Sequence, residues 1–115
     1  MAHDIKAHLR FLPLSAQKVR LVVDAVRGKD AVKAVDTLRF MPQRAAEPVM
    51  KLLNSAIANA EENFGVSRDD LFVATIFADE APTRRWRRFA ARGRFKAILR
   101  RTSHVTVILR ERETA

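Results

Sequence analysis

Residues 71–110 read LFVATIFADEAPTRRWRRFAARGRFKAILRRTSHVTVILR, and this stretch decides the fold. Its two ends, 71–80 and 102–110, are rich in β-branched and aromatic residues, which predicts two strands. In the second, Val105, Val107 and Leu109 fall on one face. Two such strands can pair antiparallel, so the segment between them, 82–99, becomes a hairpin far longer than the usual two to five residues. Gly93 is the expected point of reversal.

The segment between the strands carries the whole surplus charge. Residues 84–101 hold nine of the 22 Lys and Arg residues and no acid, so the remaining 13 basic residues balance the 13 acidic ones and the formal +9 lies here. Such a block, with aromatic residues among the arginines, is typical of a protein that binds a polyphosphate backbone with exposed bases. The predicted RNA contacts are Arg84, Arg85, Trp86, Arg87, Arg88, Arg92, Arg94, Lys96, Arg100 and Arg101.

Other interpretations of this segment stay open. A solvated surface is one, although surfaces selected only for solubility usually mix charges of both signs. A helical arginine-rich motif is another, against which stand Gly93 and the absence of an N-cap residue between Arg84 and Phe89. Trp86, Phe89 and Phe95 could stack on bases or anchor the arm to the body.

Toward the N-terminus, the pattern predicts a strand followed by helices. Asp4–Leu12 alternates, with Ile5, Ala7, Leu9 and Phe11 expected on the buried side, and Pro13 ends the strand. Ser15 and Asp30 are candidate N-caps of two amphipathic helices, with Gly28 closing the first. A third helix is expected over roughly 43–63, where Pro48 should kink the first turns unless the helix begins close to it.

Length and composition predict one domain over 1–115 with a single core, and the strand pattern predicts a protruding basic hairpin at 82–100. The chain has no cysteine, and no run of A, V, I, L, M, F or W exceeds four residues, so we expect a soluble intracellular protein without disulfides. His3, His8 and His104 lack metal-ligand spacing, so neither a metal nor a cofactor is expected. Asp79 and Glu80 point to opposite sides of a strand, which argues against an acid–base pair and against catalysis.

Four basic residues of the body are further candidate RNA contacts: Lys18, Arg20, Arg27 and Lys29. Lys18 and Arg20 diverge by about 200° around a helix, so they cannot share one flat contact face. Ordinary solvent exposure is an open alternative for each of the four.

Several strings together resemble a known family. They are SAQKVRLV at 15–22, RGK at 27–29, SAIANAE at 55–61, the DE-x-P element at 79–82, ARGR at 91–94 and RRTSHVTV at 100–107. In this order and spacing they closely resemble the bacterial type of large-subunit ribosomal protein L twenty-two, over nearly the whole chain.

The resemblance implies an α+β fold, with three helices packed on a small three-stranded antiparallel sheet and a long protruding β-hairpin. It also implies a structural constituent of the large ribosomal subunit in the cytoplasm. Its expected partners are large-subunit ribosomal RNA, neighbouring large-subunit ribosomal proteins and the nascent peptide, with no membrane contact. The body would lie near the outlet of the peptide exit tunnel and support subunit assembly. The hairpin tip, Phe89, Ala90, Ala91, Arg92 and Gly93, would line the tunnel wall.

The tip departs from the family pattern. Many members carry Pro-Arg-Ala-x-Gly-Arg where this chain has FAARGR at 89–94, so a Pro and an Arg are missing and a Phe is gained. A DNA-binding or nucleoid-associated module using the basic arm is the alternative function. A membrane-active arm is disfavoured because the segment lacks an amphipathic stripe.

Overall fold

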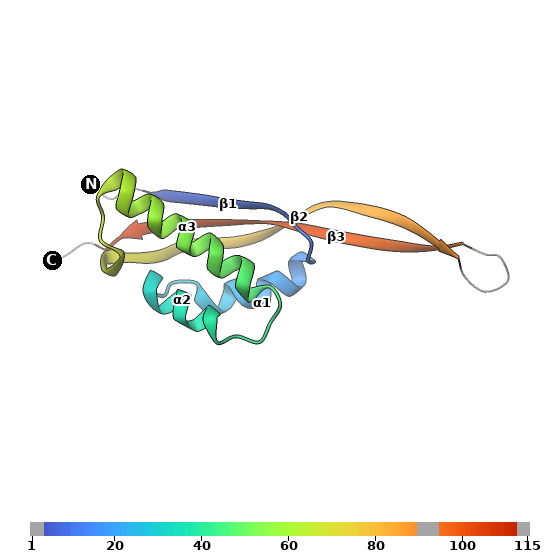
Figure 1. The fold of residues 1–115 in the computed structure, drawn as a ribbon, viewed down its shortest axis with the longest axis horizontal. Coiled ribbons are helices and arrows are strands. Elements are labelled where there is room, and N and C mark those ends of the chain that lie inside the picture. The colour runs from blue at the N-terminus through green and yellow to red at the C-terminus, as the bar shows by residue number, and fades with distance from the viewer. Residues whose placement is uncertain (1–3, 90–94, 113–115) are drawn as a thin grey trace.

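Three strands and three α-helices make up the fold, seen in a computed structural model that describes the backbone of residues 4–89 and 95–112 and the side chains of 4–83 and 100–112 (Figure 1). The elements are β1 (Ile5–Leu12), α1 (Ala16–Val26), α2 (Ala31–Arg39), α3 (Ala46–Phe64), the 3-10 turn η1 (Arg68–Asp70), β2 (Leu71–Phe89) and β3 (Phe95–Glu111). The sheet is antiparallel in the order β1-β3-β2. The expected α+β class is therefore confirmed.

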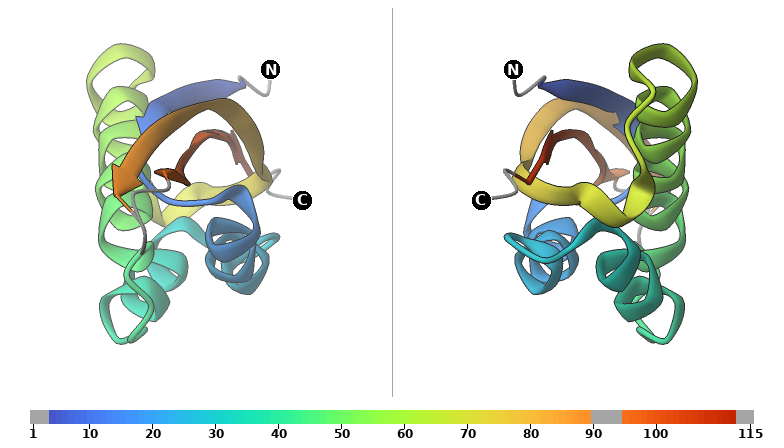
Figure 2. Two further views of the ribbon diagram at one scale, coloured as in Figure 1. Left: turned by 90° about the vertical axis from the view of Figure 1, so that its right-hand side faces the viewer. Right: turned by 90° about the vertical axis from the view of Figure 1, so that its left-hand side faces the viewer.

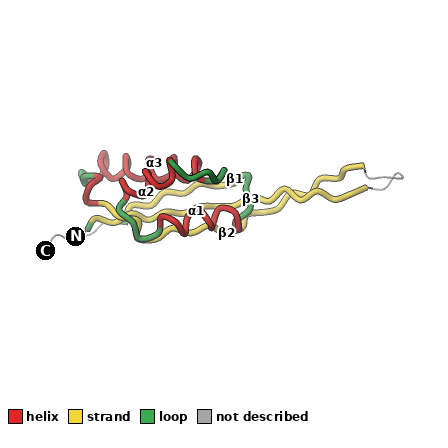
Figure 3. The backbone as a smooth tube through the Cα atoms, turned by 90° about the horizontal axis from the view of Figure 1, so that it is seen from below, coloured by secondary structure: helices red, strands yellow, loops and turns green. Residues whose placement is uncertain are grey.

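The two long strands form the predicted hairpin. Their pairing runs from Leu71 opposite Glu111 to Phe89 opposite Phe95, so the ladder continues far beyond the body. The molecule measures 69 × 25 × 19 Å along its principal axes, and Figures 1 and 3 show the hairpin extending away from the helices. The predicted reversal at Gly93 lies outside the described residues.

One irregularity interrupts the ladder at the root of the hairpin. The register shifts between Ala81 and Arg84, where Pro82 has no N–H to donate. The Thr102 hydroxyl donates to the Pro82 carbonyl oxygen at 3.1 Å, which joins the strands across the interruption. The root is thus fixed even though regular pairing lapses there.

The core lies between one face of the sheet and the helices. Val105, Val107 and Leu109 are fully buried, as their alternation predicts, and they belong to one cluster with the apolar stripes of all three helices. Figure 2 shows the helices gathered below and beside the strands. Within the described residues, no helix is long and apolar enough to cross a bilayer.

Helix ends follow the local chemistry of their sequences. Ser15 caps α1 by accepting from the Lys18 N–H, and Gly28 and Gly65, at φ of 81° and 64°, stop α1 and α3 in the left-handed conformation that glycine adopts without strain. The third helix begins at Ala46, which places Pro48 in the first turn. No intrahelical bond is lost there, because first-turn N–H groups have no helical acceptor.

One local prediction is wrong, and another is confirmed in position but not in its hydrogen bond. Phe11 does not face the core, because a bulge between Leu9 and Leu12 shifts the register and Leu12 takes the buried position. Asp30 occupies the N-cap position of α2, yet its side chain makes no cap hydrogen bond and its carboxylate instead pairs with Arg112 at 2.5 Å. Both differences come from tertiary contacts that a local pattern does not contain.

Candidate nucleic-acid interface

A recess of about 820 Å³ opens at the root of the hairpin, between the start of α1 and strands β2 and β3. Four cationic residues line it: Lys18 from α1, Arg44 from the segment before α3, and Arg100 and Arg101 from β3. One carboxylate, Glu80, also lines it. Charges from three separate parts of the chain therefore meet with a clear positive excess.

These four cations differ from most others in the body. Seven ion pairs join described cations to carboxylates elsewhere, among them Arg27–Asp24, Lys51–Glu47 and Arg68–Glu61. Within the described part of the chain, no ion pair reaches Lys18, Arg44, Arg100 or Arg101, and all four are exposed. Cations held near one another without internal carboxylate partners favour an external anion.

Neutral hydrogen-bonding residues complete the lining. Ser15, Gln17, Thr83 and Thr102 contribute to the recess, and the first turn of α1 lies against it. The first N–H groups of a helix have no helical acceptor, and they attract anions together with the helix dipole. The recess thus offers the hydroxyl, amide and guanidinium groups that commonly contact phosphate oxygens.

The hairpin beyond the recess brings like charges into register. Arg84 is paired with Arg100 along the β2–β3 ladder, and Arg88 is paired with Lys96. Like charges directly opposite each other destabilise an antiparallel pair. A bound polyanion would relieve this repulsion. The structure positions Arg84, Arg85, Trp86, Arg87, Arg88 and Lys96 along this ladder by backbone alone, and Arg92 and Arg94 lie outside the described residues.

The four predicted body residues lie in different places. Lys18 joins the recess, whereas Arg20 and Arg27 donate to the carbonyl oxygens of Ala78 and Ile76 on β2, at 3.2 and 2.8 Å. Lys29 lies near Thr37 in a separate depression. RNA contact by Arg20, Arg27 and Lys29 stays a prediction. Arg20 and Arg27 also join α1 to β2 through their hydrogen bonds to the carbonyl oxygens.

Arg44 is a recess residue that the sequence pattern missed. It stands alone between two helices, with no neighbouring cation to draw attention to it. Its place beside Lys18 follows from the packing of α3 against β1 and of α1 against β2, which no local signal contains.

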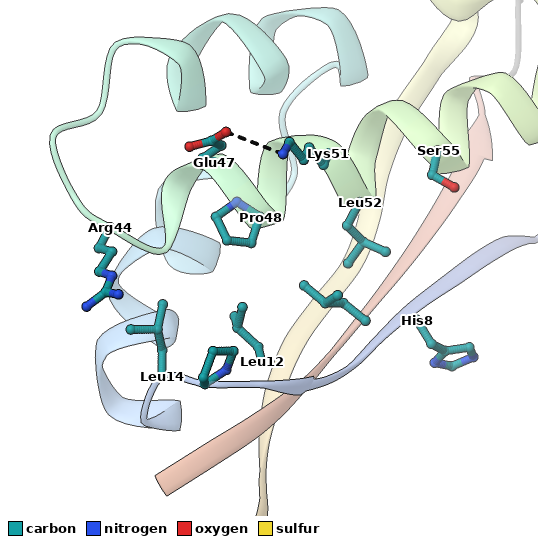
Figure 4. Close-up of a pocket in the computed structure, with 11 residues that line it drawn as sticks. His8, Leu12, Leu14, Arg44, Glu47, Pro48, Lys51, Leu52 and Ser55 are labelled. Carbon is teal, nitrogen blue, oxygen red and sulfur yellow. Dashed lines mark ion pairs between the residues drawn. The ribbon is translucent and has the colours of Figure 1, made fainter. Parts of the chain in front are cut away.

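An apolar groove of about 660 Å³ adjoins the recess and shares Pro13, Leu14 and Arg44 with it. Figure 4 shows Leu12, Leu14, Pro48 and Leu52 between β1 and the first turns of α3, with Arg44 at one end and His8 at the other. The Glu47–Lys51 ion pair lies above it. Arg44 therefore stands at the boundary between an apolar and a cationic surface.

Among the described residues, no group of three or more His, Cys, Asp and Glu side chains could hold a metal ion. Two histidines instead make hydrogen bonds on the sheet. His8 is hydrogen-bonded to the Thr106 hydroxyl, and His104 accepts a hydrogen bond from the Phe11 N–H. Asp79 and Glu80 diverge, with Glu80 in the recess and Asp79 paired with His104 in the β2–β3 register.

Together these features define a small basic α+β protein with a long hairpin and an anion-attracting recess at its root. Residues 7–110 match the family model described as "Ribosomal protein L22p/L17e", and the chain belongs to that family. It is 52% identical over 106 residues to "Large ribosomal subunit protein uL22" of Mesoplasma florum, covering 92% of this chain and 95% of that protein. The proteins of the same name from Thermoanaerobacter sp. (strain X514) and Chloroflexus aggregans are 46% and 45% identical, covering 96% and 95% of this chain and 99% and 96% of theirs.

Proposed function

We propose that this chain is a structural constituent of the large ribosomal subunit in the cytoplasm, that it binds large-subunit ribosomal RNA, and that it performs no catalysis. Its partners are that RNA and neighbouring ribosomal proteins. Family membership over residues 7–110 supports the assignment to the large subunit. Four cations converge on one recess and make no ion pair with any described residue, which supports RNA contact by the body.

The hairpin and the recess make different contacts with the RNA. The hairpin, with its opposed like charges, enters between RNA segments, since the surrounding phosphates offset the repulsion between Arg84 and Arg100 and between Arg88 and Lys96. The recess at the root of the hairpin binds phosphates of RNA that lies outside the part that the hairpin enters. Guanidinium groups suit both tasks because they bind phosphate bidentately and stack on bases.

We assign the hairpin tip, 89–93, to the wall of the peptide exit tunnel, near the nascent chain, and the body to the neighbourhood of the tunnel outlet. The family supports both assignments. A photo-crosslinker at Arg92 in assembled subunits tests the first, with crosslinks to a stalled nascent chain as the expected result. Crosslinks confined to the exterior of the subunit would contradict it.

The salt dependence of RNA binding tests the recess. A double variant, Lys18→Gln with Arg44→Gln, loses two recess cations, and its control, Lys33→Gln with Arg39→Gln, loses two cations that are ion-paired on α2. Affinity for a large-subunit ribosomal RNA transcript is measured across a series of salt concentrations. Each lost phosphate contact reduces the slope of log affinity against log salt by roughly 0.7–0.9.

The recess variant should therefore lower the magnitude of the slope by about 1.4–1.8, and the control should leave it almost unchanged. Equal slopes for the two variants would remove the recess from the interface. Equal affinity of the unaltered chain for the transcript and for duplex DNA would favour the DNA-binding alternative.

A further inference from the structure

Phe11 has an unusual backbone conformation. Its φ is 56°, and among the described residues it is the one non-glycine residue with a positive φ. A bulky aromatic residue rarely adopts this region, and such outliers persist where the surrounding structure imposes them, often at functional sites. Here the conformation falls in the bulge between Leu9 and Leu12.

The bulge leaves the Phe11 ring exposed, where the alternation of β1 predicts that it is buried. Continued alternation along β1 would put Phe11 with Ile5, Ala7 and Leu9 on the helix-covered face, yet its side chain is 61% exposed. Leu12 fills the core instead. The bulge therefore exchanges which apolar side chain is buried, and it leaves the larger one facing solvent.

His104 holds Phe11 in this position through two contacts. The Phe11 N–H donates to His104 Nδ1 at 3.0 Å, and the two rings meet edge to face, with centroids 4.7 Å apart and planes at 84°. His104 lies between the buried residues Ser103 and Val105 and so points to the opposite, outer face of the sheet. The Phe11 ring is thus anchored at its backbone and at its edge, which orients it before any ligand arrives.

The outer face around Phe11 carries further aromatic and cationic groups. Phe77 is 38% exposed and is paired with Thr106 of β3. The Thr106 hydroxyl is hydrogen-bonded to His8 Nδ1 of β1 at 3.1 Å. Lys6 and Arg10 alternate with His8 along β1, and within the described residues neither makes an ion pair. Asp79 is the carboxylate nearest in register to His104.

We propose that the outer face of the sheet binds an unpaired stretch of RNA, with one base stacked on Phe11, a second base near Phe77, and Arg10 and Lys6 contacting phosphates. Exposed aromatic side chains on an open sheet bind single-stranded RNA by stacking in several unrelated proteins. This inference rests on the proposed function and adds a second contact surface, on the side of the sheet away from the helices.

RNA is favoured over a protein partner for two reasons. The unpaired charges that flank the aromatic residues on β1 are cationic, which complements phosphate. Phe11 also lies close along the chain to the candidate nucleic-acid interface, because Pro13, two residues later, lines the recess together with Arg100 and Arg101.

Stacking can be tested with the full chain and a short single-stranded oligoadenylate that carries one fluorescent adenine analogue. The variants are Phe11→Leu, which keeps an apolar side chain without a ring, and Phe11→Tyr, which keeps the ring. Phe40→Leu is the matched control, since Phe40 is 82% exposed at the end of α2. Phe11→Gly is a fourth variant that accepts the positive φ without strain, so it removes the ring and retains the bulge.

Loss of one stacked base should weaken binding of the oligonucleotide about 5- to 150-fold in Phe11→Leu and Phe11→Gly and abolish quenching of the analogue. Phe11→Tyr and Phe40→Leu should bind like the unaltered chain. Binding of Phe11→Leu and Phe11→Gly within twofold of the unaltered chain would overturn the inference.

Other outcomes separate this inference from the proposed function. If the recess variant weakens binding of the ribosomal RNA transcript while the Phe11 variants bind oligoadenylate normally, the outer face is not an RNA surface and the proposed function stands. If the Phe11 variants bind both RNAs normally but are poorly incorporated into large subunits, the face contacts a protein and the inference fails. If the recess variant binds the transcript normally and the Phe11 variants bind both RNAs normally, both proposals are contradicted.

Discussion

Arg27 donates a 2.8 Å hydrogen bond from its guanidinium to the carbonyl oxygen of Ile76, which ties the end of α1 to β2. Arg20, two turns earlier on the same helix, does the same to Ala78. β2 is an edge strand of the described sheet, and these contacts occupy carbonyl groups two residues apart along it. Arg20 and the C-cap residue Arg27 therefore protect a sheet edge that could otherwise pair with another chain.

Replacing Arg27 by Ala should lower the free energy of unfolding by about 1–2 kcal/mol, since the hydrogen bond involves a charged donor but is partly exposed. Arg27→Lys should recover part of the loss, because one ammonium group cannot reach both Asp24 and the Ile76 carbonyl with the planar geometry of a guanidinium. Urea unfolding followed by circular dichroism measures both variants. A loss below about 0.3 kcal/mol in Arg27→Ala would contradict the assignment.

Leu109 lies in the centre of the core, fully buried on β3. Truncation to Ala should cost about 2–5 kcal/mol of unfolding free energy through lost burial and a residual cavity. Leu21, 65% exposed on α1, is the matched control, and its truncation should cost less than about 0.5 kcal/mol. Thermal and urea unfolding provide the measurements, and similar losses at the two positions would show that the core is misassigned.

Gly65 ends α3 at φ 64°, and nothing lies within 4 Å of a Cβ atom added there. The cost of Gly65→Ala should therefore be conformational and not steric, on the order of 1 kcal/mol. Gly65→Asn should cost less, because Asn tolerates the left-handed region better than Ala. Equal stability of the Ala variant and the unaltered chain in urea unfolding would contradict this account.

Asp4, the residue directly before β1, forms a 2.6 Å ion pair with Arg110 of β3. The hydrogen bond from Arg110 holds the pKa of Asp4 below its usual value of 3.8. A carboxylate whose pKa is lower in the folded chain stabilises it above the unfolded pKa, and this contribution disappears as the pH falls through the folded pKa. Asp4→Asn should thus be slightly less stable than the unaltered chain near neutral pH.

The stability difference between these two proteins should vanish in strong acid, where both lack the charge at position 4. High salt should also reduce the difference at neutral pH, since the pair is exposed and screened. Urea unfolding over a series of pH values makes the comparison. A difference that persists unchanged in acid would show that Asn disrupts β1 for another reason.

Much of the fold could be predicted because its signals are local. The stripe Val19, Val22, Val23 and Val26 and the alternation Val105, Val107 and Leu109 each repeat with the period of one element, and both sets are buried. Ser15, Gly28 and Gly65 mark helix ends through their own side chains or through the lack of one. The hairpin could be predicted as well, because two strong strands bracket the basic segment.

The candidate interface could be predicted only in part. The charge of 84–101 is a property of composition and is visible in the sequence. The inclusion of Arg44, by contrast, depends on packing between elements distant in the chain, and so does the diversion of Arg20 toward the β2 carbonyls. A helical wheel shows which residues are exposed, but it does not show which neighbour each exposed side chain meets.

By itself, the sequence determined the elements, their buried faces and the location of the surplus charge, because each of these depends on residues close together in the chain. Tertiary structure alone decided that Lys18, Arg44, Arg100 and Arg101 share one recess and that Phe11 leaves the core for the outer face. The physical reason is the same in both cases. A bulge and the packing of helices on a sheet set distances between residues dozens of positions apart, and local periodicity carries no information about those distances.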